Sequence, residues 1–212
     1  MKWFYVAQRA GSMHHLFLAS RNAHKTRELA EALGAEFGLE DLRGHPEIAV
    51  VIEDGATFAE NARIKATAVS RQLPGLVLAD DSGLEVDSLG GAPGVFSARY
   101  AGAEASDEAN RQKLLVELAK RGPDAARLAR FLCALALARD GRVLALCKGS
   151  VAGQIVRKAR GSAGFGYDPL FQPNEFSETF AELPAATKNS ISHRGRAVTK
   201  MKQFLRGANL LK

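Results

Sequence analysis

Two adjacent carboxylates, Asp80 and Asp81, follow the apolar residues 76–78 within the run Ala79-Asp80-Asp81-Ser82-Gly83. Charge repulsion and loss of hydration both oppose keeping such a pair ionised at the end of a buried strand, so the pair needs a compensating partner. A hard divalent cation would supply one, because Mg²⁺ takes oxygen ligands, commonly together with substrate phosphates. An Asx-turn with two solvated carboxylates is the alternative interpretation.

A third carboxylate, Glu53, follows the apolar run 48–52, which we predict to be a strand. Ligands of α/β proteins gather at the carboxyl ends of strands, so Glu53 and Asp81 are predicted to hold one Mg²⁺ between them. The metal would polarise a phosphate and help to deprotonate a water, with a carboxylate as the proton acceptor. Alternatively, Glu53 and Asp54 are polar residues of a turn.

The segment Ser20-Arg21-Asn22-Ala23-His24-Lys25 lies between a predicted strand, residues 15–19, and a helix that Gly34 should end. Free backbone N–H groups at such a helix start attract phosphate oxygens. Ser20 and Asn22 could add donors and Lys25 a positive charge. Alternatively, Asn22 only caps the helix and Lys25 is solvated. The glycine spacing of a Walker-type P-loop is absent.

A basic residue is also predicted on the buried side of the next helix. The sequence Thr57-Phe58-Ala59-Glu60 matches a capping box, which predicts a helix start. Lys65 shares helical spacing with apolar residues, so it should point to the same side as they do. The apolar residues of this stripe are Phe58, Ala62, Ala66 and Val69.

The run Phe165-Gly166-Tyr167-Asp168 combines aromatic rings with a carboxylate, and its glycines allow close approach of a ligand to the backbone. An aromatic ring can stack on any nucleobase, whereas a choice among bases requires hydrogen bonds. The alternative is that these aromatic side chains fill the core beneath a loop.

Lys188 and the run Ser192-His193-Arg194-Gly195 supply donors. A 6-oxopurine has an acceptor at O6 and a donor at N1, and adenine has the reverse. Asp168 facing N1–H, with His193 or Arg194 facing O6, would accept hypoxanthine or xanthine and leave adenine unmatched. The sequence does not show how guanine would be rejected. Alternatively, His193 and Arg194 are a basic pair in the first turn of a surface helix.

The composition is that of an ordinary globular protein: 212 residues, 46% hydrophobic and 25% charged. No apolar stretch approaches the length of a membrane span, so a membrane location is not expected. Residues 1–12 are interpreted as a leader or appended segment, and residues 13–212 as a single two-lobed domain. Cys133 and Cys147 are predicted to be buried thiols in a reducing cytoplasm. The net charge of +6 and pI near 9.5 fit either nucleic acid or a small polyanion in a cleft.

The order of the predicted elements indicates an α/β fold with a mixed sheet. Two apolar runs joined at Asp140-Gly141 predict an antiparallel hairpin. A helix is predicted to begin after Ser106, and the last helix is predicted to be capped by Ser192. The strand from Leu76 is predicted to end at the carboxylate pair, before a glycine-rich stretch.

In combination, these segments resemble the inosine/xanthosine triphosphate pyrophosphatase family over nearly the whole chain from His15. The motifs that carry the resemblance are Ser20-x-Asn22-x-x-Lys25, Glu53, Ala79-Asp80-Asp81-Ser82-Gly83, Gly90-Gly91-Ala92-Pro93-Gly94, Phe165-Gly166-Tyr167-Asp168-Pro169 and Ser192-His193-Arg194-Gly195. Arg21 departs from the pattern, because the family often has a small residue there.

The resemblance implies an elongated α/β protein, usually a homodimer, with two lobes flanking a central substrate cleft. It implies Mg²⁺-dependent hydrolysis of ITP, dITP and XTP to the monophosphate and pyrophosphate, which clears deaminated purines from the nucleotide pool. Asp81 would be the proton acceptor and a metal ligand, assisted by Glu53. The polyphosphate would be bound by Ser20, Asn22, Lys25, Lys65 and Ser82. The base would be bound by Phe165, Gly166, Tyr167, Asp168, Lys188, His193 and Arg194.

Two other interpretations remain. A nucleic-acid-binding module would fit the basic pI, but carboxylates at a strand end would repel a phosphate backbone in the absence of metal, so no stable nucleic-acid partner is expected. A Maf-type nucleotide pyrophosphatase would act on modified or pyrimidine nucleotides.

Overall fold

The amino-terminal segments form a strand, a turn and a helix, as predicted. The computed structural model describes residues 13–208 and 210, so the predicted leader, residues 1–12, lies outside the described part. Strand β1 (His14–Leu18) leads into helix α1 (Ala23–Leu33), whose cap is Asn22. The chain leaves α1 at Gly34, where φ is 82°, a value that favours glycine.

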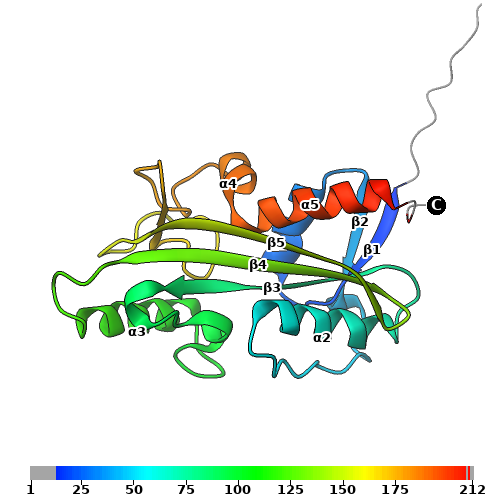
Figure 1. Ribbon diagram of the computed structural model, residues 1–212, viewed down its shortest axis with the longest axis horizontal. Helices are drawn as coiled ribbons and strands as arrows, with labels where there is room; N and C mark the ends of the chain where they lie inside the picture. The colour runs from blue at the N-terminus through cyan, green and yellow to red at the C-terminus, as the bar shows by residue number, and fades with distance from the viewer. Residues whose placement is uncertain (1–12, 209, 211–212) are drawn as a thin grey trace, which may run out of the picture.

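A six-stranded mixed sheet forms the centre of the molecule, in the order β2-β1-β3-β4-β5-β6. Strand β1 runs parallel to β2 and β3, and the remaining pairs are antiparallel. The further strands are β2 (Phe37–Asp41), β3 (Val77–Val86), β4 (Leu128–Arg139), β5 (Arg142–Ile155) and β6 (Phe171–Pro173). In Figure 1, β3, β4 and β5 extend along the long axis of the molecule. The predicted mixed α/β sheet is confirmed.

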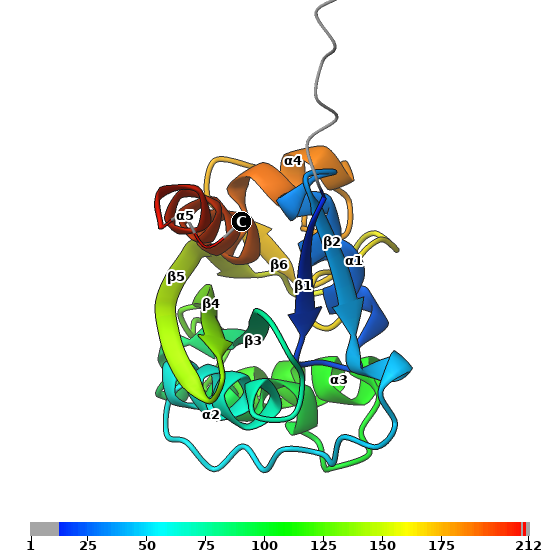
Figure 2. The same cartoon turned by 90° about the vertical axis from the view of Figure 1, so that its right-hand side faces the viewer.

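Helices cover the long strands from both sides (Figure 1). Helices α2 (Phe58–Ser70) and α3 (Asp107–Ala119) lie along one side, and α4 (Ala185–Ile191) and α5 (His193–Gly207) along the other. Figure 2 shows α1 beside β1 and β2. Three short 3₁₀ helices complete the described elements: η1 (Leu42–Gly44), η2 (Asp87–Leu89) and η3 (Gly94–Arg99). No helix in the described ranges is long and apolar enough to cross a bilayer.

The apolar clusters of the described residues fall into two groups, which we call lobes. One lobe contains β1, β2, α1 and α2, with apolar clusters around Leu29 and Ala66. The other contains α3, β6 and the loops around them, with a cluster around Leu118 and Phe180. Strands β3 and β4 contribute side chains to the clusters of both lobes, so the sheet joins the two.

The predicted strand at residues 48–52 is wrong. These residues form no strand, and the side chains of Val50 and Ile52 are 81% and 79% exposed. The second strand is instead Phe37–Asp41, whose sequence FGLED has little apolar character. A strand also needs a neighbouring strand to pair with. Ile48 is buried in the core, but no strand of the described chain pairs with this run. Glu53 therefore lies in an extended loop before α2.

The predicted end of the third strand at Asp81 is also wrong, since β3 continues to Val86. Strand β1 pairs with β3 only at Val77 and Leu78. Beyond Leu78, β3 continues past the end of β1 and beside the loop that enters α1. The carboxylates therefore lie at the carboxyl end of β1 but within β3, where pairing with β4 keeps their backbone fixed.

The remaining predicted features are largely confirmed. Strands β4 and β5 are joined at Asp140 and Gly141, whose positive φ values of 51° and 74° suit a tight hairpin turn. Ser106 caps α3 and Ser192 caps α5. Both cysteines are free, but only Cys133 is buried, whereas the predicted burial of Cys147 is wrong because its side chain is partly exposed.

Candidate active site

Lys65 joins the two carboxylates that were predicted to act together. The predicted capping box is present at the start of α2, and the Lys65 side chain lies on the buried side of that helix, as predicted. Lys65 Nζ donates to Glu53 Oε2 at 2.8 Å, to Asp81 Oδ1 at 3.0 Å and to the backbone oxygen of Asp80 at 2.9 Å. One ammonium group thus holds Glu53 and Asp81 together although they lie on a loop and a strand.

Asp81 keeps one oxygen without a protein partner. Its Oδ2 is buried and accepts no hydrogen bond from the described residues. Burial, together with the nearby charge of Glu53, raises the pKa of Asp81 to about 6, although Lys65 and Lys25 oppose this rise. Such a carboxylate is ionised at neutral pH and still basic enough to accept a proton.

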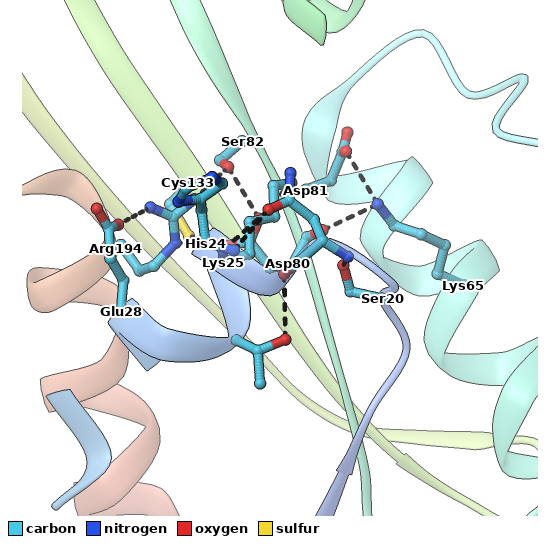
Figure 3. Close-up of polar contacts among 12 residues, drawn as sticks. Ser20, His24, Lys25, Glu28, Lys65, Asp80, Asp81, Ser82, Cys133 and Arg194 are labelled. Atoms are coloured by element: carbon cyan, nitrogen blue, oxygen red, sulfur yellow. Dashed lines mark hydrogen bonds and ion pairs between the residues drawn. The ribbon is translucent and has the colours of Figure 1, made fainter. Parts of the chain in front are cut away.

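Asp80, the adjacent carboxylate, is fully engaged in a buried network (Figure 3). It pairs with Lys25 Nζ at 2.8 Å and with Arg194 Nε at 3.0 Å. It also accepts from the Ser82 hydroxyl at 2.8 Å and the Cys133 thiol at 3.3 Å. Burial opposes its ionisation, but Arg194 and Lys25 outweigh burial and hold the pKa of Asp80 well below its usual range.

The loop before α1 has the predicted position beside the carboxylates. Asn22 does cap the helix, since its Oδ1 accepts from the N–H groups of His24 and Lys25 at 3.0 and 3.1 Å. Ser20 Oγ accepts from Asn22 N at 3.1 Å, which tightens the turn. Lys25 is not a solvated residue, because it reaches inward to Asp80.

Glu28, a residue that the motifs did not single out, anchors the two cations from the carboxyl-terminal segment. Its Oε1 accepts from Lys188 Nζ at 2.6 Å, and its Oε2 accepts from Arg194 Nη1. Lys188 also donates to Asp168 Oδ2 at 2.6 Å, and Arg194 to Ser82 Oγ at 2.8 Å. Arg194, at the start of α5, is therefore bound to residues of both α1 and β3, and it is almost completely buried.

The aromatic segment 165–168 forms a turn held by its own carboxylate and by α3. Asp168 Oδ2 accepts from Phe165 N at 2.9 Å. The Gly166 N–H donates to Asp107 Oδ2 at 2.6 Å, and Arg111 Nη1 donates to the Gly166 oxygen at 2.7 Å. Gly166 has φ 60°, in the left-handed region. Both polar groups of Gly166 are thus fixed by one helix.

Tyr167 and His193 lie deeper. The Tyr167 hydroxyl donates to the Ser97 oxygen at 2.9 Å, and its ring is buried, so the predicted alternative of a core-filling aromatic residue holds for Tyr167. The His193 ring stacks on Phe131 with centroids 4.7 Å apart. Burial and the nearby Arg194 charge place the pKa of His193 well below its usual value, so the imidazole is neutral.

Two joined pockets contain all but one of the predicted site residues. The first, which we call the carboxylate pocket, has a volume of about 320 Å³ and is lined by Ser20, Asn22, Lys25, Glu53, Lys65, Asp81 and Ser82, among others. The second, the aromatic pocket, has a volume of about 110 Å³ and is lined by Asn22, Lys25, Ser82, Phe165, Gly166, Tyr167, Asp168, His193 and Arg194, among others. Asn22, Lys25, Ser82 and Ala98 line both and mark where the pockets meet.

Lys188 lines a neighbouring cavity behind Phe165 and reaches the aromatic pocket only through Asp168. A larger cavity of about 850 Å³ contains none of the predicted site residues. The carboxylate pocket joined to the aromatic pocket is therefore the candidate active site.

Comparison with known proteins places the chain in a family. The model of the Ham1 family matches residues 16–204, nearly all of the described chain. The chain belongs to the Ham1 family. The predicted resemblance is confirmed, because many curated relatives of this Ham1-family chain are named dITP/XTP pyrophosphatase.

The similarity to relatives and to solved structures extends over almost the whole length of this chain and of theirs. A dITP/XTP pyrophosphatase of Geobacillus kaustophilus is 50% identical over 191 residues, covering 89% of this chain and 93% of the relative. One of Shouchella clausii is 45% identical over 195 residues, covering 92% and 98%. A HAM1 protein structure from Coxiella burnetii has a TM-score of 0.81 at 41% identity, covering 92% of this chain and 100% of that chain.

The sequence motifs missed several residues of this Ham1-family site, chiefly Glu28, Asp107 and Arg111. Glu28 follows Lys25 by three positions on α1, a spacing typical of an exposed ion pair on a helix. Asp107 and Arg111 lie in the first turns of α3, where an acidic residue is usual. Their contacts are with residues far away in the sequence, and local spacing carries no signal for such contacts.

Proposed function

We propose that this chain hydrolyses ITP, dITP and XTP to the nucleoside monophosphate and pyrophosphate, and so removes deaminated purines from the nucleotide pool. The observation that carries the proposal is the pair of joined pockets, one with carboxylates and lysines and the other with an aromatic ring and a carboxylate–histidine pair. The names of the curated relatives support the same substrate class.

Asp81 is the proton acceptor in this proposal. A water attacks the α-phosphorus, the bond between that phosphorus and the α,β-bridging oxygen breaks, and the bridging oxygen leaves with pyrophosphate. Asp81 takes the proton that the water loses, and the orphaned Oδ2 is the atom available for it. The pKa of about 6 suits this role near neutral pH. Lys25 and Lys65 offset the charge of the phosphates.

Mg²⁺ fits the same pair of carboxylates. Glu53 and Asp81 both accept hydrogen bonds from the Lys65 ammonium, so their carboxylates already converge on one cationic group. The described part of the chain contains no cluster of three metal-ligating side chains, so waters and phosphate oxygens would have to complete the ligands of Mg²⁺. When bound, Mg²⁺ would polarise a phosphate and lower the pKa of a water.

The base is selected in the aromatic pocket. Phe165 stacks on the purine, and the hydrogen bonds that Asp168 accepts from the described residues both fall on Oδ2, which leaves Oδ1 for N1–H. His193 is neutral, so one ring nitrogen carries a proton that can be donated to O6. Adenine, with an acceptor at N1 and donors at the 6-amino group, would leave both groups unmatched.

The proposal extends to the assembly and the compartment. We expect a homodimer that acts on the free nucleotides of the cytoplasm, with no stable nucleic-acid partner. Light scattering on the purified chain tests the dimer. A measured mass near twice the 22.7 kDa of one chain is expected, and a monomer would contradict it.

The decisive experiment measures product formation from ITP, XTP, dITP, ATP, GTP, dTTP and UTP, with Mg²⁺ and with a chelator. We expect pyrophosphate from the first three alone, and only with Mg²⁺. In ¹⁸O-labelled water, the label should enter the monophosphate, because water attacks the α-phosphorus. Release of orthophosphate and a diphosphate would contradict the proposal, and preferred turnover of UTP or dTTP would favour a Maf-type enzyme.

A further inference from the structure

Arg99 is a residue of the site to which neither the motifs nor the proposed mechanism gives a role. It is the last residue of η3, which is packed tightly against β3. The Ser97 hydroxyl accepts from Leu84 N at 2.9 Å and donates to the Gly94 oxygen at 2.6 Å. A Cβ on Gly83 would lie 2.4 Å from that hydroxyl, so only glycine allows η3 to lie so close.

Hydrogen bonds from Tyr167 and Asn110 fix the backbone just before Arg99. The Ser97 oxygen accepts from the Tyr167 hydroxyl at 2.9 Å, and the Ala98 oxygen accepts from Asn110 Nδ2 at 3.1 Å. Both carbonyl groups that precede Arg99 are therefore held. A side chain on so rigid a support loses less entropy when it binds a ligand.

The Arg99 side chain lines the carboxylate pocket and lies over the Phe96 ring at 5.3 Å. Among the described residues, its guanidinium makes no hydrogen bond or ion pair. The other three basic residues of this pocket are engaged. Lys25 pairs with Asp80, Lys65 pairs with Glu53 and Asp81, and the Arg21 guanidinium donates to the backbone oxygens of His45 and Ile48.

The charge balance of the pocket leaves room for a cation that is free to bind phosphate. Lys25 and Lys65 pair with Asp80, Glu53 and Asp81, and Arg194 shares Asp80 but also pairs with Glu28, so the paired groups give no excess of positive charge. A terminal phosphate adds about −1.5 to −2 charge at neutral pH. A guanidinium presents a planar set of N–H donors that matches phosphate oxygens. Among the described residues, the Arg99 guanidinium has no hydrogen-bond or ion-pair partner, so its donors are available.

The position of Arg99 determines which part of a bound nucleoside triphosphate it would contact. Arg99 lines the carboxylate pocket but not the aromatic pocket, and the two pockets meet at Asn22, Lys25 and Ser82. A base stacked on Phe165 places the α-phosphate near this junction and the distal phosphates beyond it, on the side of Arg99.

We propose that Arg99 binds the β- and γ-phosphates and holds the leaving pyrophosphate, so that it makes the enzyme prefer triphosphates to diphosphates. This inference rests on the proposed function. The cation–π contact between the Arg99 guanidinium and the Phe96 ring restrains the side chain before the ligand arrives.

The test compares Arg99→Ala and Arg99→Lys with the wild-type enzyme in Mg²⁺. For Arg99→Ala we expect the inhibition constant of pyrophosphate to rise about 10- to 100-fold, the loss of one charge-assisted contact. Inhibition by IMP should stay within about two-fold, and the ratio of ITP to IDP turnover should fall. Arg99→Lys should lie between the two, because it keeps the charge but not the planar set of donors.

Arg63→Ala is the matched control, since Arg63 is exposed on α2 and lies two positions from Lys65 along the helix. It should leave every constant unchanged. Equal losses of pyrophosphate and IMP binding in Arg99→Ala, or no loss of either, would overturn the role of Arg99. An inactive wild-type enzyme would overturn the proposed function instead, and direct calorimetry with magnesium pyrophosphate would still test Arg99.

Discussion

At the scale of single residues, the adjacent carboxylates Asp80 and Asp81 have opposite characters. Successive side chains of a strand point to opposite faces, so the two meet different surroundings within β3. Asp80 is enclosed by Arg194 and Lys25, which hold its pKa well below the usual range. Burial gives Asp81 a pKa of about 6 and leaves one of its oxygens unpaired. Asp80 therefore organises cations, while Asp81 is free to react.

Replacement of Asp81 by Asn should separate catalysis from folding. We expect Asp81→Asn to lower kcat for pyrophosphate release from ITP by about 10²- to 10⁴-fold, because the amide cannot accept the proton from water. The measurement is steady-state kinetics with Mg²⁺. Asp124→Asn, an exposed carboxylate in a loop, is the control and should be fully active. Wild-type turnover by the Asp81 variant would refute the assigned proton acceptor.

The same variant should show a specific pH dependence of stability without metal. The folded-state pKa of Asp81 is raised to about 6 from 3.8. The stability that Asp81 contributes is therefore fully present below about pH 4 and is lost as the pH rises through 6. Thermal melts in chelator should show the Tm of Asp81→Asn, relative to wild type, increasing from pH 5 to pH 7. A relative Tm that falls over this range would contradict the raised pKa.

Arg194 should matter first for stability, because Asp80 and Glu28 depend on it. Arg194→Ala removes one cationic partner from the buried Asp80 and one from the partly buried Glu28, which we expect to cost about 3–5 kcal/mol in the free energy of unfolding. Urea unfolding measures this cost. The control on the same helix is Arg206→Ala, which removes an exposed pair with Glu36 and should cost at most about 1 kcal/mol. Equal costs for both variants would contradict the structural role of Arg194.

At the scale of elements, α3 positions a loop that it does not adjoin in the sequence. Asp107 and Arg111 hold the N–H and C=O of Gly166, and Gly166 follows the ring proposed to stack on the base. The helix thereby fixes the aromatic pocket from outside. Replacing one of these α3 side chains should therefore weaken recognition of the base and leave the rate of phosphate cleavage unchanged.

Asp107→Ala tests this effect. It removes the acceptor for the Gly166 N–H, and we expect the KM for ITP to rise about 10-fold with kcat little changed, the value of one hydrogen bond to a charged group. Asp107→Asn keeps an acceptor oxygen and should restore most of the affinity. Kinetics of both variants with ITP and ATP measure the effect. If Ala and Asn behave alike, the contact with Gly166 does not position the loop.

The elements that the sequence predicted well are those with local signals. Helix α2 carries a complete capping box, and the hairpin has Asp140 and Gly141 with positive φ. The two errors concern strands, whose pairing partners are distant. Strand β2 has few apolar residues and is held by hydrogen bonds to β1. The run 48–52 has the composition of a strand, but no strand lies beside it.

At the scale of the whole molecule, the site depends on packing on the other side of β5. A Cβ on Gly149 would lie 2.0 Å from the His193 oxygen and 2.7 Å from Ala197 N, so α5 lies directly on the strand at this point. Because α5 begins with His193 and Arg194, the contact sets the depth of both side chains in the site. A change at Gly149 should therefore act at a distance.

Gly149→Ala should lower the Tm by about 2–10 °C, the result of forced overpacking. It should also lower the affinity for ITP, because the displaced helix moves the aromatic pocket. Calorimetry and inhibition by IMP measure the two effects. Gly207→Ala is the control, since no atom lies within 4 Å of a Cβ built there. Loss of stability without loss of IMP affinity would show that α5 does not set the pocket.

The candidate site could be predicted from the sequence to the extent that its residues lie in short motifs. Asp81, Lys25 and Phe165 were found because an adjacent carboxylate, a helix start and a glycine-rich aromatic run mark them in the sequence. Glu28 was not found, because its partners Lys188 and Arg194 are more than 150 residues away, and only the fold brings them together. Arg99 was missed because its significance lies in the absence of a partner among the described residues.

Strands β4 and β5 are 12 and 14 residues long, and they run through both lobes between α2 and α3 on one side and α4 and α5 on the other (Figure 1). The two lobes therefore share one continuous pair of hydrogen-bonded strands. The distance between the two lobes can change only if β4 and β5 bend. Bending these paired strands would strain many backbone hydrogen bonds at once. Under the proposed function, these two strands would set the distance between the bound base and the distal phosphates.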